Sequence, residues 1–439
     1  MITFDQLNLS KQLLNALSEL GYIYPTPIQE KSFPVIMSGK NVIGVAQTGT
    51  GKTFAYLLPI LRQLKYSEER QPRILIVVPT RELVLQIVKE IEKLSKYVSV
   101  RFAGVYGGTN INTQKTVVYN GLDILVGTPG RLMDLALTGI LRWKSIQTLV
   151  IDEVDEMFNL GFRTQLVNLI DALPKKRQTL LFSATMSDDV KKIISEFVIA
   201  PVTVAIANYS TPVEKIEQTA YYVPNFHTKV NLLEHLLKNH PELNRVLVFV
   251  KSKRLADNLY TEISNKFPNQ LGVIHSNKTQ PQRFGAIQQF GSGELRVLIA
   301  TDIIARGLDI ENITHVINFD TPDIATDYIH RIGRTGRADK TGASITFISE
   351  AEKEFQVQIE TYMNKEIPIV ELPKDVKIST KYTEDEKPVL FDKGYYKSST
   401  IKKSKGAFHE KKGKNMKINL GGPYKRRMAL EKKQGRKRK

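Results

Sequence analysis

Residues 41–53 read NVIGVAQTGTGKT, an apolar run that is followed directly by a glycine-rich turn. The run, residues 41–46, is short and rich in β-branched side chains, which predicts a buried strand, and the residues after the turn have the periodicity of a helix. A strand that passes through a tight turn into a helix is the first half of a βαβ unit. The stretch therefore predicts an α/β fold with a parallel sheet.

The same alternation of short apolar runs with longer amphipathic segments extends along most of the chain. Predicted strands lie at residues 41–46, 73–78, 123–126, 148–152 and 179–182, and in a second series at residues 245–250, 272–275, 296–300, 315–318 and 343–348. Polar residues and Pro212 interrupt both periodicities between the two series. We therefore predict two α/β lobes, residues 1–206 and 214–370, joined by a hinge at residues 207–213.

The composition is that of a globular protein that is large enough for two cores. The chain has 439 residues, of which 41% are apolar and 25% charged. It contains no cysteine, which excludes disulfides and thiolate metal sites and suits a reducing compartment. Residues 1–20 mix charged with apolar side chains, and no apolar run reaches membrane-spanning length. We therefore expect a cytoplasmic protein without a signal peptide or membrane segment.

The net charge of +18 is concentrated near the carboxyl end. Residues 397–439 hold seventeen Lys or Arg and two acids, so they carry +15 and the preceding 396 residues only +3. This segment is rich in Lys, Gly and Arg and poor in large apolar residues, so we predict that residues 371–439 form an extension and a basic disordered tail. Such a tail would tether a polyanion or, as the alternative, only improve solubility.

The glycine-rich turn also predicts a phosphate site. A turn of this kind directs backbone N–H groups and a helix N-terminus at phosphate oxygens, while Lys52 adds charge and the Thr53 hydroxyl can hold Mg²⁺. The predicted phosphate-binding residues are Thr48, Gly49, Thr50, Gly51, Lys52 and Thr53. The general pattern has Gly where Ala46 stands, and the alternative interpretation is an ordinary strand-to-helix turn.

Carboxylates follow the predicted strand at residues 148–152. Asp152, at the carboxyl end of this strand, is placed to hold a nucleotide-bound Mg²⁺, and Glu153 beside it can orient or deprotonate a water. An acidic cluster alone is usually a solvated face or a helix cap. Because this cluster ends an apolar strand one hundred residues after Lys52, it is the predicted partner of the phosphate site.

With these motifs the sequence resembles the DEAD-box RNA helicases over about residues 1–365. Residues 21–29, GYIYPTPIQ, resemble the adenine-reading Q motif of that family, and Phe4 lies seventeen residues before it. The amide of Gln29 can pair with both the N6 donor and the N7 acceptor of adenine, which implies ATP and not GTP. Ala46 is usual in the phosphate loop of the family. Val154 departs from its DEAD motif, and we expect a tolerated change of volume there.

The resemblance extends to segments that contact RNA phosphates and sugars in the family. The matching residues of this chain are Pro79, Thr80, Arg81, Gly107, Gly108, Thr128, Pro129, Gly130, Arg131, Arg283 and Thr301. Taken singly, several of these segments have an ordinary structural interpretation, because Pro is common at the first position of a helix and a Gly pair is common in a turn. As a set they imply an RNA-binding surface.

The arginine-finger motif of the family matches residues 330–337, HRIGRTGR. An arginine delivered from another lobe stabilises the charge that builds on a transferring phosphoryl group, so the resemblance implies catalytic roles for Arg334 and Arg337. It also implies a ribose contact at Asp309. Residues that couple hydrolysis to RNA binding are implied at Asp155, Ser183, Thr185 and His330.

The resemblance thus implies two RecA-like lobes that bind ATP, Mg²⁺ and single-stranded or duplex RNA. RNA-stimulated hydrolysis of ATP to ADP and phosphate would drive local unwinding of RNA or remodelling of RNA–protein complexes. The binding of RNA would not depend on its base sequence. The alternatives are a DNA translocase, against which the Q motif argues, and a non-catalytic RNA clamp, against which the complete catalytic set argues. We expect a monomer, and ribosomal precursor and messenger RNA both remain open as targets.

Overall fold

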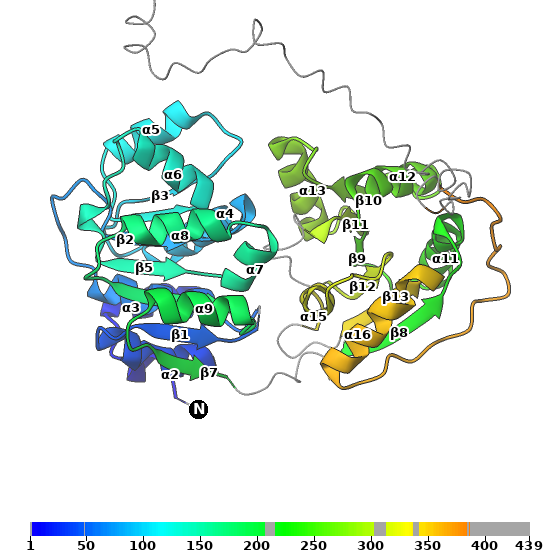
Figure 1. Ribbon diagram of the computed structural model, residues 1–439, viewed down its shortest axis with the longest axis horizontal. Coiled ribbons are helices and arrows are strands. Elements are labelled where there is room, and N and C mark those ends of the chain that lie inside the picture. Colours follow the sequence, from blue (N-terminus) through cyan, green and yellow to red (C-terminus); the bar gives the residue numbers. More distant parts are fainter. Residues whose placement is uncertain are drawn as a thin grey trace, which may run out of the picture. The chain divides into compact units, whose positions relative to one another are not determined.

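The computed structural model describes residues 2–47, 49–206, 216–302, 313–336, 342–383 and 386. Within these residues the chain forms two parallel β-sheets, one in each half, and helices pack on them (Figure 1). The prediction of two parallel-sheet α/β lobes is therefore confirmed. The predicted hinge, residues 207–213, and the basic residues from 397 onward lie outside the described residues, as do Thr48, Asp309 and Arg337.

The first lobe is built on a seven-stranded sheet. Its elements are η1 (Phe4–Leu7), α1 (Lys11–Glu19), α2 (Pro27–Met37), β1 (Val42–Val45), α3 (Lys52–Gln63), β2 (Ile74–Val77), α4 (Arg81–Leu94), β3 (Phe102–Val105), α5 (Ile111–Tyr119), β4 (Ile124–Gly127), α6 (Pro129–Leu137), η2 (Trp143–Ser145), β5 (Thr148–Ile151), α7 (Val154–Asn159), α8 (Arg163–Ala172), β6 (Gln178–Ser183), α9 (Asp188–Phe197) and β7 (Val202–Ala205). The strand order is β3-β4-β2-β5-β6-β1-β7. The carboxyl ends of β5, β6 and β1 are therefore neighbours.

The second lobe is built on a six-stranded sheet with the order β10-β11-β9-β12-β13-β8. Its elements are β8 (Ile216–Tyr222), α11 (Phe226–Asn239), β9 (Val246–Phe249), α12 (Lys253–Ser264), β10 (Leu271–Ile274), α13 (Gln280–Ser292), β11 (Val297–Ala300), β12 (His315–Asn318), α15 (Ala325–Ile332), β13 (Gly342–Ile348), η3 (Glu350–Glu352) and α16 (Lys353–Met363).

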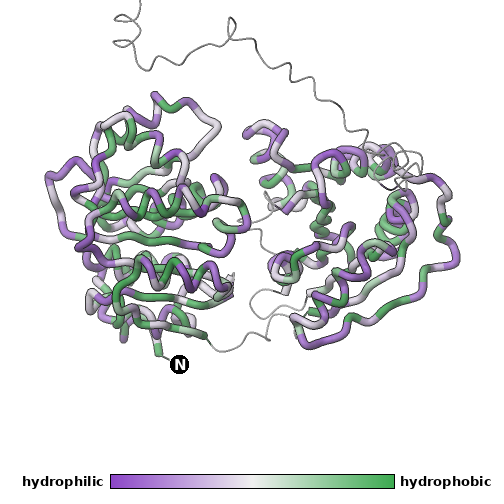
Figure 2. Tube along the Cα trace, viewed as in Figure 1, coloured by the Kyte–Doolittle hydropathy of each residue, from purple (hydrophilic) through white to green (hydrophobic). Residues whose placement is uncertain are grey.

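Apolar side chains on both faces of each sheet form the cores. In the first lobe, Ile74 and Ile76 of β2 belong to the cluster on one face, and Leu75 and Val77 to the cluster on the other. This alternation is what a strand buried on both faces requires, and it explains why the strands read as continuous apolar runs. Figure 2 shows the strands of both lobes as mainly hydrophobic, with hydrophilic residues along the helices outside them.

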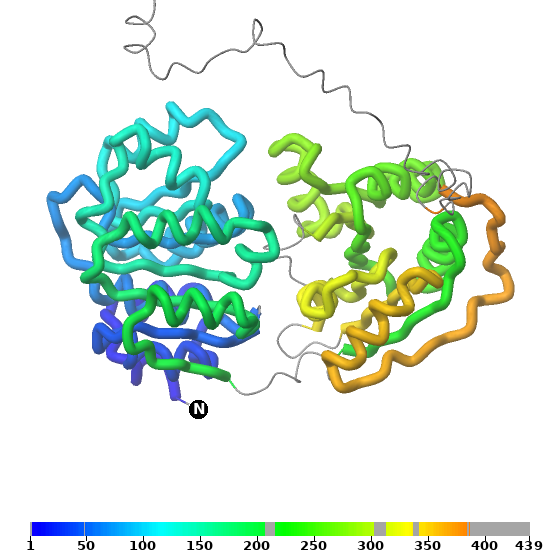
Figure 3. The backbone as a smooth tube through the Cα atoms, in the orientation of Figure 1, coloured from blue at the N-terminus to red at the C-terminus, as the bar shows by residue number. Residues whose placement is uncertain are grey.

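The chain after α16 continues along the second lobe (Figure 3). Ile369 forms a parallel bridge with Ala220 of β8, and Leu372 and Val376 pack into the core of this lobe. Further on, the Asn225 side-chain amide donates to the carbonyl of Ser379 at 2.6 Å. The packed part of the lobe thus reaches past residue 370, where we had placed its end. None of the helices in the described part of the chain is long and apolar enough to cross a membrane.

Candidate active site

The glycine-rich turn after β1 forms an open cradle in front of α3. Gly49 and Gly51 both have positive φ angles, 79° and 87°, which favour glycine. A Cβ on Gly51 would lie 2.4 Å from the side-chain nitrogen of Gln29, so a larger residue there would displace the Gln29 amide. The Thr50 hydroxyl donates to the carbonyl of Gln47 at 2.7 Å and closes the turn. Backbone N–H groups at such a turn and at the start of the helix suit a phosphate.

Gln29 connects this cradle to the predicted Q motif. Its amide nitrogen donates to the Gly51 carbonyl at 3.1 Å, and its oxygen accepts the backbone N–H of Thr26 at 2.9 Å. The side chain is only 5% exposed and is fixed in the third position of α2. A base that formed hydrogen bonds with the remaining donor and acceptor positions of this amide would therefore lie next to the turn that is predicted to bind the phosphates.

The resemblance also implies that Phe4 is a nucleotide-binding residue, and the structure places it beside the Q motif in a supporting position. Its ring is buried in the core of the first lobe, and its backbone N–H donates to the carbonyl of Ile23 at 3.2 Å. Tyr22 and Tyr24 are the exposed rings of this loop, and Tyr22 packs edge-on against Phe54 with 5.3 Å between ring centroids. The sequence analysis missed Tyr22, although an aromatic residue in the loop before Gln29 was a visible signal.

The predicted acidic cluster lies against the phosphate turn. Lys52 Nζ is 3.0 Å from Glu153 Oε1, and both side chains are buried. Burial raises the pKa of Asp152 to about 6, because the charge on Glu153 adds to this effect and Lys52 only partly opposes it. Glu153 has a φ of 53°, a left-handed conformation that is uncommon outside glycine and frequent at functional sites. Val154 is fully buried in the core, as we expected.

The cluster has a surplus of buried negative charge. Burial lowers the pKa of Lys52, but the charges on Glu153, Asp152 and Asp155 outweigh it and hold this pKa above its usual value. Glu153 Oε2 is buried and accepts no hydrogen bond from the described residues. Three carboxylates around one ammonium group, with the Thr53 hydroxyl nearby in sequence, suit a hard divalent cation with oxygen ligands. The residues present therefore fit Mg²⁺.

The predicted coupling residues of the first lobe are also brought to this cluster. Asp155 Oδ2 accepts both the backbone N–H of Thr185, at 2.8 Å, and its hydroxyl, at 2.9 Å. The Ser183 hydroxyl donates to the Thr185 carbonyl at 2.8 Å. The end of β6 is thus held to the acidic cluster by hydrogen bonds.

His330 of the second lobe reaches the first lobe. Its Nδ1 lies 2.6 Å from Glu156 Oε1, and both side chains are buried. A carboxylate oxygen of Asp327 lies within 4.8 Å of these ligand-type atoms. Arg334, which is also buried, follows one turn after His330 at the end of α15. The contact therefore joins the helix before the predicted arginine finger to α7, which follows Glu153.

A second pair of contacts between the lobes involves α4 and α13. Arg283 of α13 forms a buried ion pair with Glu82 of α4 at 2.9 Å. Arg81 donates to the side-chain oxygen of Gln280 at 3.0 Å, and Arg283 donates to the same oxygen at 3.1 Å. Neither Glu82 nor Glu156 was predicted as a site residue, because their partners lie far away in the sequence.

The remaining predicted RNA contacts lie at the carboxyl ends of strands. Arg81, after β2, lies against Gly108, where a Cβ would be 2.3 Å from the guanidinium. The set that follows β2, β3, β4 and β11 comprises Pro79, Thr80, Gly107, Thr128, Pro129, Gly130 and Thr301. Arg131 is buried, and it donates to Gln114 at 2.9 Å and to the Thr109 carbonyl at 3.0 Å. This geometry favours support of the adjacent loop by Arg131 over direct contact with RNA.

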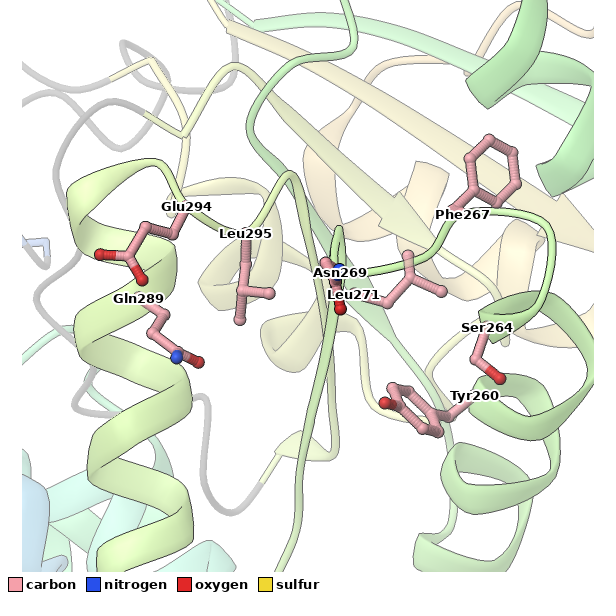
Figure 4. A pocket seen from close by; sticks show the side chains of 8 residues that line it. All are labelled: Tyr260, Ser264, Phe267, Asn269, Leu271, Gln289, Glu294 and Leu295. Atoms are coloured by element: carbon pink, nitrogen blue, oxygen red, sulfur yellow. The ribbon is translucent and has the colours of Figure 1, made fainter.

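A separate hollow of about 560 Å³ lies in the second lobe (Figure 4). Its lining comes from α12, α13 and the segments around the start of β10, namely Tyr260, Ser264, Phe267, Asn269, Leu271, Gln289, Glu294 and Leu295. In parallel sheets, ligands bind beyond the carboxyl ends of the strands. The hollow lies at the amino end of β10, so it does not belong to the candidate active site.

The contact of His330 with Glu156 predicts a pH dependence. Burial lowers the pKa of His330, but the hydrogen bond and charge of Glu156, with the charges of Asp155 and Glu153, outweigh it and raise this pKa. The stabilisation is complete below the pKa of a free imidazole, about 6.5, and is lost as pH rises through the raised pKa. RNA affinity in the presence of a non-hydrolysable ATP analogue should therefore fall over that range.

The variant His330→Gln should bind RNA more weakly at low pH and lose most of this pH dependence. His240→Gln is the matched control, because His240 also pairs with a carboxylate, that of Glu242 at 2.8 Å, but at the surface. Its pH profile should follow that of the unmodified protein. A His330→Gln profile that runs parallel to the unmodified one would show that another group titrates.

Comparison with known proteins shows extensive similarity over both lobes. Residues 26–193 match the family described as DEAD/DEAH box helicase, and residues 228–339 match the helicase conserved C-terminal domain. The chain is 40% identical over 354 residues to the DEAD-box ATP-dependent RNA helicase CshA of Geobacillus kaustophilus, which covers 80% of this chain and 74% of that protein. It is 38% identical over 396 residues to the ATP-dependent RNA helicase RhlB of Actinobacillus succinogenes, which covers 87% of this chain and 95% of that protein.

Solved structures show the same similarity in three dimensions. S. cerevisiae Dbp5 bound to RNA and ADP BeF3 has a TM-score of 0.77 at 28% identity, over 85% of this chain and 96% of that chain. Mss116p bound to ssRNA and AMP-PNP has a TM-score of 0.76 at 29% identity, over 85% of this chain and 80% of that chain.

Proposed function

Because this chain belongs to the DEAD-box family of ATP-dependent RNA helicases, we propose that its acidic cluster hydrolyses ATP only when α15 of the second lobe is in contact with α7 of the first. The observation that supports this proposal most directly is the buried pair of His330 and Glu156, at 2.6 Å. Arg334 follows His330 by four residues, and Glu156 follows Glu153 by three. The pair therefore connects the segment that holds the predicted arginine finger with the segment that holds the predicted general base. Hydrolysis then depends on how the two lobes meet.

Lys52 Nζ and Glu153 Oε1 form an ion pair at 3.0 Å. The phosphates of ATP would give Lys52 a stronger anionic partner, and the carboxylate of Glu153 would be released to orient and deprotonate a water. Thr53 and Asp152 would hold Mg²⁺, which supplies charge neutralisation at the phosphate oxygens. Arg334 would stabilise the charge that develops on the transferring phosphoryl group.

RNA binding is proposed along the carboxyl ends of the strands of both lobes. Arg81 and Arg283 are cations of different lobes that share the side chain of Gln280, so RNA phosphates that displaced this contact would meet both lobes at once. Contacts of this kind read phosphates and 2′-hydroxyls and not base edges. The structures of Dbp5 bound to RNA and of Mss116p bound to single-stranded RNA support this proposal.

We also propose that the protein works as a monomer in the cytoplasm, on ribosomal precursor or messenger RNA complexes. Its lack of cysteines suits a reducing compartment. Contacts with phosphates and 2′-hydroxyls do not depend on the base sequence, so such a protein can act on many different structured RNAs.

The decisive experiment is an ATPase assay with single-stranded RNA and with DNA of the same sequence. We expect RNA to stimulate hydrolysis strongly and DNA to stimulate it weakly, because 2′-hydroxyls distinguish the two strands. We also expect ATP to support unwinding of an RNA duplex and GTP to fail, because of the Gln29 amide. Equal stimulation by DNA would contradict the proposed RNA contacts, and equal use of GTP would contradict the role of Gln29.

A further inference from the structure

Tyr56 is a buried polar residue of α3 to which the mechanism above gives no role. Its side chain is fully buried, and its ring packs on Phe182 of β6 with 5.3 Å between centroids. Gly44 of β1 makes room for that ring, because a Cβ there would lie 2.4 Å from Phe182. The Tyr56 hydroxyl donates to Asp152 Oδ2 at 3.0 Å. The core of the first lobe thus places one phenol directly behind a proposed ligand of the cation.

The same phenol interacts with Thr53, one turn earlier on α3. Burial raises the pKa of Tyr56, and the charge and hydrogen bond of Asp152 raise it further, whereas a side-chain hydrogen bond with Thr53 lowers it. Thr53 and Asp152 are therefore both neighbours of this one phenol.

The Asp152 carboxylate is fixed in its orientation by these contacts. Its second oxygen, Oδ1, accepts the backbone N–H of Glu153 at 3.0 Å, so the carboxylate is held at both oxygens. A phenol is neutral at physiological pH and therefore orients this carboxylate without adding charge to a cluster that already has a surplus of it.

We propose that Tyr56 is a positioning residue for the divalent cation, holding the Asp152 carboxylate in the arrangement that binds Mg²⁺. The inference rests on the proposed function, because it takes Thr53 and Asp152 as the ligands. Hydrogen-bond partners behind the ligands of a metal typically change its affinity by about 10- to 100-fold when they are removed. A Tyr56 that served only to pack the core would change stability and leave the cation dependence of nucleotide binding unchanged.

The test uses the full-length protein and the variant Tyr56→Phe, which removes one oxygen atom and keeps the ring. The matched control is Tyr328→Phe, because Tyr328 is equally buried and its hydroxyl donates to Gln218 at 2.9 Å, within the second lobe. Affinity for a fluorescent ADP analogue is measured across Mg²⁺ concentrations and in excess EDTA. The measurements are made in the cold, so that a lowered melting temperature does not prevent them. Binding of Mn²⁺ in the presence of ADP, followed by electron paramagnetic resonance, gives a readout independent of turnover.

For Tyr56→Phe we expect about 10-fold more Mg²⁺ for half-maximal nucleotide binding, weaker Mn²⁺ binding, and unchanged affinity in EDTA. Tyr328→Phe should superimpose on the unmodified protein in all three measurements. A Tyr56→Phe curve that superimposes on the unmodified one, or an affinity lowered equally with Mg²⁺ and with EDTA, would overturn the inference. If the unmodified protein itself bound nucleotide equally well with Mg²⁺ and with EDTA, the proposed cation site would fail, independently of Tyr56.

Discussion

Glu153→Gln should lower the rate of ATP hydrolysis by about 10²- to 10⁴-fold, which is the usual contribution of a general base. The amide keeps the size of the side chain but cannot take a proton from water. ATP and RNA should remain bound together, because the cradle at Gly51 and the contacts between the lobes do not depend on this carboxylate. Single-turnover hydrolysis and co-purification of RNA with an ATP-bound protein measure the two effects separately.

Lys52→Ala should also stop hydrolysis, but by weakening capture of ATP, since it removes the cation that faces the phosphates.

The chemical control for Glu153→Gln is Glu196→Gln, the same substitution at an exposed position of α9. It should leave both turnover and binding unchanged. Normal turnover in Glu153→Gln would show that another group activates the water.

Arg334→Ala should lower kcat by about 10³-fold or more, as expected for an arginine that stabilises a transferring phosphoryl group. The KM for ATP should change much less, because the arginine acts on charge that develops only in the transition state. Arg334→Lys should recover little, because an ammonium cannot reproduce the fork of a guanidinium. Steady-state kinetics with saturating RNA give the two constants.

The control for this prediction is Arg245→Lys, which makes the same change just before the amino end of β9. Arg245 is partly buried and donates to the Gly291 carbonyl at 2.6 Å, away from the carboxyl ends of the strands. A fall in kcat limited to the Arg334 variants would support the arginine-finger assignment. A rise in KM with unchanged kcat would instead make Arg334 a residue that binds ATP.

The strands that the sequence predicted are the ones buried on both faces. All ten apolar runs coincide with observed strands to within one or two residues, and the missed strands are β3, β7 and β8. β3 and β7 are the two short edge strands of the first sheet and are mostly only partly buried, and β8, at one edge of the second sheet, alternates buried with more exposed residues. The other edge strand of the second sheet, β10, was predicted because its residues are almost all buried. Apolar runs identify interior strands well, whereas an edge strand depends on a neighbour that the local sequence does not contain.

The function was predicted from motifs, and the family relationship confirms it. Lys52, Asp152 and Glu153 could be found because their chemistry follows from a turn or a strand end that is visible locally. Glu82, Glu156 and Tyr56 could not, because each acts through a partner at least ninety residues away, and its burial becomes visible only in the folded chain. The roles of the individual site residues remain predictions.

The segment that follows α16 is anchored to the second lobe by hydrogen bonds. The Asn225 and Asn231 amides hold the carbonyls of Ser379 and Lys377, at 2.6 and 2.7 Å. Because α11 begins just after the carboxyl end of β8, this anchor lies at the same edge of the second sheet as Thr301. If the basic residues from 397 onward bind RNA, as predicted, their covalent attachment through this anchored segment, and not their charge alone, would set the effective concentration of RNA at the protein.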